Sequence, residues 1–292
     1  MDGRVIVLPD GRRLGYLVVG AGKPVVYFHG TASSRLEARL LTELADAAQL
    51  QIICIDRPGY GLSTFLPPKS LCDFADDINF LVDHLGIERF GVIGWSGGGA
   101  FALTHAALVS ERITRAVVVG APALPFDVST AHNMPFARYV MKLPFLGMLA
   151  LRNMQAQVLK ANGDIDAFLE SRQGKRMLKG WPKEDAKFFS NRNWATLMYG
   201  SMAEAFRQRD IGVKTVFLEH QLFMKPWPVS LSRIPAGKVY VWQGAEDKTC
   251  RVDNAYRIAR AVSGVHLHVF EGQGHCVMFG NFDKLSEVFR SD

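Results

Sequence analysis

The chain of 292 residues lacks the features that define several classes of protein. No apolar run reaches the roughly 18 residues that a membrane-spanning helix needs, so no membrane span is expected. The first residues show no signal-peptide pattern, which predicts a cytoplasmic location. The four cysteines form no CxxC pair and no His/Cys spacing typical of zinc. Neither a disulfide framework nor a metal site is therefore expected.

The excess of positive over negative charge belongs to one segment of the chain. The net charge is +6, and residues 125–236 hold 16 Lys and Arg against 9 Asp and Glu. The segment has no dense basic run with interleaved aromatic residues, which argues against nucleic-acid binding. Two interpretations stay open: a solvated basic surface, or a site for an anionic substrate or for an acidic carrier that delivers one.

Strand-like and helix-like stretches alternate along the chain. A hairpin is predicted first, with strands at 5–8 and 14–19 joined by a turn at Asp10 and Gly11. Continuous apolar strands that alternate with amphipathic helices predict an α/β fold with a mostly parallel sheet covered on both faces. Further strands are predicted at 24–28, 51–55, 90–93, 115–119, 238–242 and 266–270, and helices at 35–48, 71–85, 100–108, 256–262 and 282–289.

Residues 125–236 interrupt this alternation. They are rich in Met, Lys and Arg, contain several prolines, and have helical patches at 137–141 and 197–206. We expect this segment to be a helical cap inserted after the sixth strand, because a long insertion at the catalytic end of a sheet excludes water and shapes a pocket. Residues 1–124 and 237–292 would then form the core.

The most informative motif is Gly94-Trp95-Ser96-Gly97-Gly98. It stands between a predicted strand and a predicted helix, where a serine on a strained turn projects its hydroxyl from the end of the sheet. Gly94 and Gly98 flank the serine at positions where a Cβ would collide with neighbouring backbone. The motif predicts that Ser96 is a catalytic nucleophile; the alternative is a glycine-rich turn that only connects two elements.

A nucleophilic serine needs a base and a carboxylate that orients the base. Asp247 follows the predicted strand 238–242, and we prefer it to Glu246 because its distance from Gly244 suits the loop. His275 is the only one of the eight histidines that follows a Gly-x-Gly sequence. The order Ser96, Asp247, His275 is that of an α/β-hydrolase triad.

An oxyanion formed during acyl transfer needs preorganised N–H donors. We expect these donors to be the backbone N–H groups of Gly97 and Thr31, with the Thr31 hydroxyl as a speculative third. His29 is predicted to brace this loop and to lie at the substrate-binding surface. Trp95 is expected either to form the floor of the acyl pocket or to pack under the turn. Phe126, Met134, Phe136, Met198 and Met202 are the apolar candidates for the pocket wall.

These motifs together resemble the α/β-hydrolase superfamily, and in particular its capped, esterase-like branch. The resemblance implies that fold, the Ser96, Asp247 and His275 triad, and no metal or other cofactor. It is carried by Leu8-Pro9-Asp10-Gly11, His29-Gly30-Thr31 with Ser33-Ser34-Arg35, Asp56-Arg57-Pro58-Gly59-Tyr60-Gly61, the Ser96 motif, Gly244 with Asp247, and Gly274-His275. Members with an aspartate nucleophile, such as haloalkane dehalogenases and epoxide hydrolases, are excluded by Ser96.

The leading hypothesis is hydrolysis of a carboxylic ester of a small molecule through an acyl-enzyme. A thioesterase, a C–C bond hydrolase or a cyclising acyl transferase is the second hypothesis, motivated by the basic segment around Lys175, Arg176 and Lys179. A ligand receptor built on a hydrolase core is the third. The sequence leaves the substrate and the oligomeric state open, because this fold hosts many chemistries.

Overall fold

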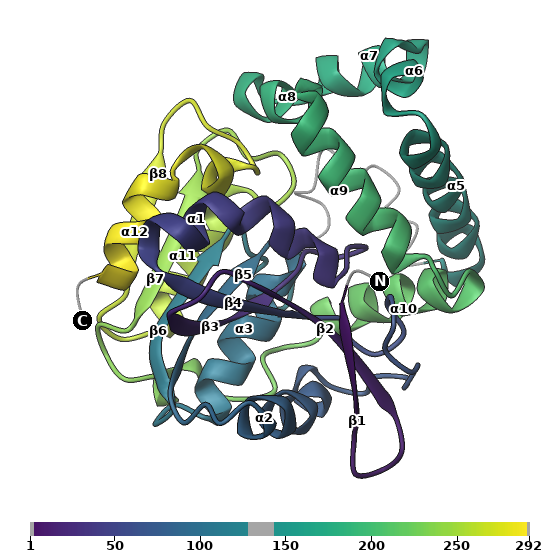
Figure 1. Cartoon of the computed structure of the whole chain (residues 1–292). Coiled ribbons are helices and arrows are strands. Elements are labelled where there is room, and N and C mark those ends of the chain that lie inside the picture. Colours follow the sequence, from purple (N-terminus) through teal and green to yellow (C-terminus); the bar gives the residue numbers. More distant parts are fainter. Residues whose placement is uncertain (1–2, 128–142, 291–292) are drawn as a thin grey trace.

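The computed structural model describes residues 3–127 and 143–290 (Figure 1). Its centre is an eight-stranded sheet with the order β1-β2-β4-β3-β5-β6-β7-β8. The first two strands pair antiparallel, as does β2 with β4, and all the other pairs are parallel. The predicted mostly parallel sheet is therefore confirmed. The strands are Arg4–Val7 (β1), Arg13–Val19 (β2), Lys23–Phe28 (β3), Leu50–Ile55 (β4), Phe90–Trp95 (β5), Ile113–Val119 (β6), Val239–Gly244 (β7) and His266–Phe270 (β8).

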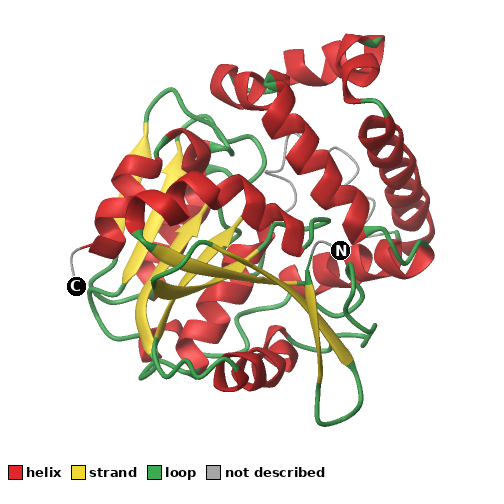
Figure 2. Cartoon of the chain, viewed as in Figure 1, coloured by secondary structure: helices red, strands yellow, loops and turns green. Residues whose placement is uncertain are grey.

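Helices cover both faces of this sheet, as Figure 2 shows. Because successive strand residues point to opposite faces, Val26 and Val92 share one apolar core with residues of α2, α3 and α11, whereas Val25 and Ile93 share the other with residues of α1 and α12. These helices span Thr42–Ala48 (α1), Ala75–His84 (α2), Gly97–Leu108 (α3), Val252–Ala261 (α11) and Phe282–Arg290 (α12). Among the described residues, no helix has both the length and the apolar character needed to cross a bilayer.

Two predicted helices begin with a turn of 3₁₀ helix. The stretch 35–48 consists of the 3₁₀ helix Arg35–Leu41 (η1) followed by α1, and 71–85 consists of Leu71–Phe74 (η2) followed by α2. In η1 the N–H and guanidinium of Arg35 bind Asp56, and Glu37 binds Tyr27 and Gly30. These bonds hold Arg35 and Glu37 toward the interior, and they accompany the tighter 3₁₀ winding of η1.

Within the described residues, six further helices are inserted between β6 and β7 and lie over the end of the sheet that carries the nucleophile turn (Figure 1). Phe188 and Met198 of this insertion join the core of one sheet face, and Tyr60 of the sheet domain joins the insertion's own apolar cluster. The inserted helices are Pro144–Gly163 (α5), Ile165–Glu170 (α6), Arg172–Gly180 (α7), Lys183–Ser190 (α8), Arg192–Ala205 (α9) and Asp210–Phe223 (α10). Short 3₁₀ turns follow at Leu231–Arg233 (η4) and Val277–Gly280 (η5).

The helix predicted at 197–206 coincides with the second half of α9. The helix predicted at 137–141, together with Met134 and Phe136, lies outside the described residues. The division into a core of 1–124 and 237–292 and a cap of 125–236 stays a prediction.

Gly98 provides a test of how closely α3 packs on the sheet. A Cβ at this position would lie 2.0 Å from the carbonyl oxygen of Phe28 and 2.5 Å from that of His29. We expect Gly98→Ala to lower the free energy of unfolding by about 2–3 kcal/mol, because backbone must move to accept the methyl group. Urea denaturation measures this change.

Gly163→Ala is the matched control, because nothing lies within 4 Å of a Cβ at the end of α5. It should leave stability unchanged or raise it by up to about 1 kcal/mol, since alanine favours helix over glycine. Equal stability of the two variants would contradict the packing described here.

Candidate active site

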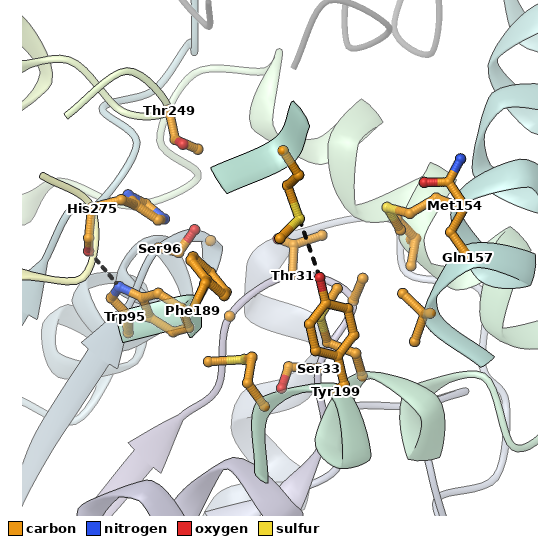
Figure 3. Close-up of a pocket in the computed structure, with 18 of the residues that line it drawn as sticks. Thr31, Ser33, Trp95, Ser96, Met154, Gln157, Phe189, Tyr199, Thr249 and His275 are labelled. Atoms are coloured by element: carbon orange, nitrogen blue, oxygen red, sulfur yellow. Dashed lines mark hydrogen bonds between the residues drawn. The ribbon is translucent and has the colours of Figure 1, made fainter. Parts of the chain in front are cut away.

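Ser96 occupies the tight turn between β5 and α3. Its backbone has φ 54° and ψ −132°, a conformation that a non-glycine residue rarely adopts. The Ser96 N–H donates to the carbonyl of Val119 at 2.9 Å. A Cβ at Gly94 would lie 2.6 Å from the carbonyl oxygen of Gly98, so the collision expected from the sequence is present. The turn directs the Ser96 hydroxyl toward the ring of His275 (Figure 3).

A buried carboxylate holds the imidazole ring. Nδ1 of His275 lies 2.8 Å from Oδ2 of Asp247. The other oxygen of Asp247 accepts the N–H groups of Thr249 and Cys250 at 2.7 and 3.0 Å. Asp247 is buried and Glu246 is exposed, so the structure brings the preferred carboxylate, rather than its neighbour, to the histidine.

This contact determines the protonation of His275. Because Asp247 accepts from Nδ1, the neutral ring carries its proton there and leaves Nε2 as an acceptor facing Ser96. Burial opposes protonation of the ring, but the charge and hydrogen bond of Asp247 outweigh it and raise the pKa of His275 above 6.5. An imidazole in this state can take a proton from a hydroxyl group.

Trp95 supports the histidine and also lines the pocket. Its indole N–H donates to the backbone carbonyl of His275 at 2.9 Å, and its ring lies 5.3 Å from the imidazole. Phe279 packs edge-on against the same indole at 5.1 Å. The structure therefore places Trp95 against the loop that carries His275 and on the wall of the cavity.

Thr31 and Gly97, the residues expected to form the oxyanion hole, lie against each other. A Cβ on Gly97 would be only 2.1 Å from the hydroxyl oxygen of Thr31, so a side chain at this position would displace Thr31. Gly97 is the first residue of α3, where backbone N–H groups have no partner within the helix and the helix dipole favours negative charge. The Gly30 N–H donates to Oε1 of Glu37 at 2.9 Å, which fixes the loop next to Thr31.

His29 does not lie where a substrate could touch it. Its side chain is fully buried, is not part of the pocket lining, and places Nδ1 2.8 Å from the carbonyl oxygen of Gly30. Burial and the charge of Arg57 lower the pKa of His29 well below its ordinary value, so the ring is neutral. The prediction of a substrate contact at His29 is therefore wrong, and its position agrees with the bracing role.

The site opens into a cavity of about 720 Å³ between the end of the sheet and the inserted helices. Apolar side chains dominate its wall, and Phe126, Met198 and Met202 are among them as expected. The other apolar lining side chains are Trp95, Pro122, Leu151, Met154, Val158, Phe168, Met177, Trp181, Phe189, Tyr199, Val216 and Phe223. Gln157, Gln173 and Arg176 add polar groups from α5 and α7.

Four buried charged residues around the site were not predicted from the sequence. Arg57 donates to the carbonyls of His29 and Gly30 and pairs with Glu219 of α10. Glu37 holds the oxyanion loop, and Asp185 of α8 accepts the N–H of His275. Arg57 lies in one of the motifs that resemble the family, so the sequence could have indicated that it matters to the site. Glu219 and Asp185 lie far along the chain from their partners, and no local pattern points to them.

Comparison with known proteins agrees with this geometry. Residues 23–282 match the family model described as alpha/beta hydrolase fold. The chain belongs to this family. The resemblance drawn from the motifs is thus confirmed, and the chain is an α/β hydrolase.

Relatives of several activities share parts of this sequence. A 2-hydroxy-6-oxo-6-phenylhexa-2,4-dienoate hydrolase from Comamonas testosteroni is 23% identical over 287 residues, which cover 94% of this chain and 88% of that protein. A cis-3-alkyl-4-alkyloxetan-2-one decarboxylase from Shewanella oneidensis is 31% identical over 154 residues, 50% of this chain and 47% of the relative. The chain spans about half the length or less of the first curated relatives that it matches.

Solved structures share the whole fold. An α/β-hydrolase fold protein from Nakamurella multipartita has a TM-score of 0.68 and 20% identity, with 99% of both chains covered. An esterase from Rhodococcus sp. ECU1013 has a TM-score of 0.66 and 19% identity, covering 100% of this chain and 98% of that chain. Within the described residues, no group of side chains is arranged to hold a metal ion.

The raised pKa of His275 predicts the pH dependence of activity. A base works in its neutral form, so kcat/KM for an ester should fall as the pH drops through a His275 pKa above 6.5. Asp247→Asn removes the charge that raises this pKa, so the acidic limb should move to lower pH, and kcat should fall by about 10⁴-fold. Ester hydrolysis between pH 5 and 9 measures both effects.

Glu246→Gln is the control, because that neighbouring carboxylate is exposed. It should keep the wild-type rate and pH profile. A collapse of activity in Glu246→Gln with normal activity in Asp247→Asn would reverse the assignment of the acid.

Proposed function

We propose that this protein is a serine hydrolase that cleaves a carboxylic ester of a small molecule through an acyl-enzyme. The observation that carries the proposal is the pair formed by Asp247 and His275, 2.8 Å apart, whose ring faces Ser96 on a strained turn. A carboxylate, an imidazole and a hydroxyl in this order make up the apparatus of acyl transfer. The helical insertion at 125–236 would act as the cap that excludes water from the reaction.

In the first half of the reaction, Nε2 of His275 takes the Ser96 proton while the serine oxygen attacks the ester carbonyl. The electron pair of the carbonyl moves onto its oxygen, and the N–H groups of Thr31 and Gly97 stabilise the resulting oxyanion. The ester C–O bond then breaks, and the histidine gives its proton to the departing alcohol. Ser96 is left acylated.

The second half repeats these steps with water. His275 takes a proton from a water molecule, the water oxygen attacks the acyl carbon, and the carboxylic acid leaves as the proton returns to Ser96. Asp247 stays ionised throughout and stabilises the imidazolium ion. No other group is needed for the balance of atoms and charge.

The cavity supports an apolar acyl group as the larger part of the substrate. Its wall consists mainly of Met, Phe, Trp and Val side chains, and its volume of about 720 Å³ lies in the range of small-molecule sites. Met residues with flexible side chains adapt to acyl groups of different shape. The solved esterases that share this fold are in keeping with an ester as the bond cleaved.

Removal of the nucleophile tests the proposal. Ser96→Ala should lower kcat for p-nitrophenyl esters by a factor on the order of 10⁶, because the hydroxyl that faces His275 is removed. Wild type should also gain one fluorophosphonate adduct by intact-mass spectrometry, and Ser96→Ala and His275→Ala should gain none. Equal turnover by wild type and Ser96→Ala would refute the assignment, and a folded wild type without adduct or turnover would point to a ligand receptor.

The second candidate substrate has an acyl group with an anionic end. This candidate includes the substrates of a thioesterase or a C–C bond hydrolase. Arg176 lines the mainly apolar cavity, together with Gln157 and Gln173. It is carried by α7, in the segment with the excess of basic residues. A relative that matches nearly the whole chain is named as a hydrolase of a dienoate, which is a carboxylate.

Paired substrates separate the two candidates. If Arg176 binds an anionic acyl end, Arg176→Gln should reduce kcat/KM for mono-p-nitrophenyl adipate about tenfold relative to p-nitrophenyl hexanoate, because a charge-assisted hydrogen bond is lost. Lys175→Gln and Lys179→Gln are matched controls, since both residues are exposed on α7 and neither lines the cavity. An unchanged preference in Arg176→Gln would leave the neutral ester as the better substrate class.

A further inference from the structure

A carboxylate from the helical insertion grips the backbone of the catalytic histidine. Asp185 lies in the first turn of α8 and is 1% exposed. Its Oδ2 accepts the N–H of His275 at 2.8 Å, and its Oδ1 accepts the N–H of Cys276, also at 2.8 Å. One carboxylate therefore spans two successive backbone donors of the loop that carries the base.

The sequence of this loop leaves room for the carboxylate. A Cβ at Gly274 would lie 2.2 Å from Oδ2 of Asp185 and 2.6 Å from its carboxyl carbon. Any side chain at this position would displace the Asp185 carboxylate from the N–H of His275. Gly272 serves a different purpose, because its φ of 72° lies in the left-handed region and a Cβ there would meet nothing within 4 Å.

Three contacts fix His275 from three directions. Asp185 holds its backbone N–H, Trp95 holds its backbone carbonyl at 2.9 Å, and Asp247 holds the ring through Nδ1 at 2.8 Å. Asp247 follows β7 and Trp95 ends β5, so both belong to the sheet domain. Asp185 is the one of the three that comes from the insertion.

The charge of Asp185 also acts on the imidazole. The ionisable groups that face the His275 ring are Asp247 on the β7 loop, Asp185 on α8 and Glu37 on η1, and each favours the imidazolium ion. Asp185 itself faces His275, Asp247 and the Cys276 thiol. Burial raises the pKa of Asp185, and its bond to the Cys276 N–H and the nearby imidazole oppose this rise.

We propose that Asp185 is a positioning residue through which the helical insertion holds His275 in register with Ser96. The triad is then complete only while α8 is seated on the histidine loop, so the insertion takes part in assembling the catalytic site as well as covering it. The proposal rests on the proposed function, since it needs a reaction in which His275 is the base. A displacement of about 1 Å in such a base is enough to slow a reaction 10²-fold.

Asp185→Asn tests the proposal with little change of shape. The amide keeps one acceptor oxygen, presents an NH₂ group to the other backbone N–H, and removes the charge. We expect fluorophosphonate to label this variant about 10- to 100-fold more slowly than wild type. The pKa of the His275 ring, followed by ¹H NMR of the free protein, should fall as well. A contact that is merely structural would lower thermal stability without moving this pKa.

Glu184→Gln is the matched control, because Glu184 is the neighbouring acid on α8, is exposed, and lies next to Lys187 rather than the histidine loop. It should behave as wild type in labelling rate and in the His275 titration. Asp185→Glu keeps the charge but shifts the oxygens, so it should label slowly while the pKa stays close to that of wild type. This variant decides the question if Asp185→Asn does not fold.

The outcomes distinguish a failure of the positioning role of Asp185 from a failure of the proposed function. A wild type that is labelled, with Asp185→Asn or folded Asp185→Glu labelled at the same rate, would overturn the positioning role and leave the serine hydrolase standing. A folded wild type that gains no adduct would instead overturn the proposed function itself.

Discussion

The buried guanidinium of Arg57 is the contact on which the arrangement of the site depends. It donates to the carbonyls of His29 and Gly30, at 2.7 and 3.2 Å, and forms an ion pair with Glu219 of α10. Breaking a buried pair by removing one partner costs about 3–5 kcal/mol, because an uncompensated charge is left behind. The loop that carries Thr31 and the helical insertion are therefore stabilised together by one cation. If the insertion moved away, Arg57 and Glu219 would each lose the partner of a buried charge.

The same construction recurs at the other edges of the insertion. On α9, Glu204 binds the guanidinium of Arg35 at 2.8 Å, and that guanidinium also binds Asp56. On α8, Asp185 binds the backbone of the histidine loop. Three inserted helices thus each place a carboxylate on the sheet domain, buried for Glu219 and Asp185 and partly buried for Glu204, while apolar clusters fill the space between. Polar contacts of this kind demand exact partners, so they specify how the insertion is seated more strictly than apolar packing does.

Local patterns explain how much could be predicted from the sequence. Apolar strands such as β4 and β5, and the serine turn between strand and helix, are set by neighbouring residues, and their positions agree with the prediction. The 3₁₀ helix η1 was predicted as ordinary helix. Its tighter winding accompanies bonds from Arg35 to Asp56 and from Tyr27 to Glu37, and the local apolar pattern contains no sign of these bonds. Asp185 contacts a loop 90 residues away, and nothing in the polar sequence of α8 marks it as buried. His29 stands in the loop of Thr31, which is why it was expected at the substrate-binding surface, but its side chain is fully buried.

Glu37 fixes the loop that carries Thr31. It lines the cavity, and its Oε1 accepts from the Tyr27 hydroxyl at 2.6 Å and from the Gly30 N–H at 2.9 Å. Its Oε2 has no hydrogen-bond partner among the described residues. Burial raises the pKa of Glu37, whereas the hydrogen bonds from Tyr27 and Gly30 and the charge of Arg57 oppose this rise. The loop that carries Thr31 is therefore held both by the guanidinium of Arg57 and by a carboxylate that the same guanidinium stabilises.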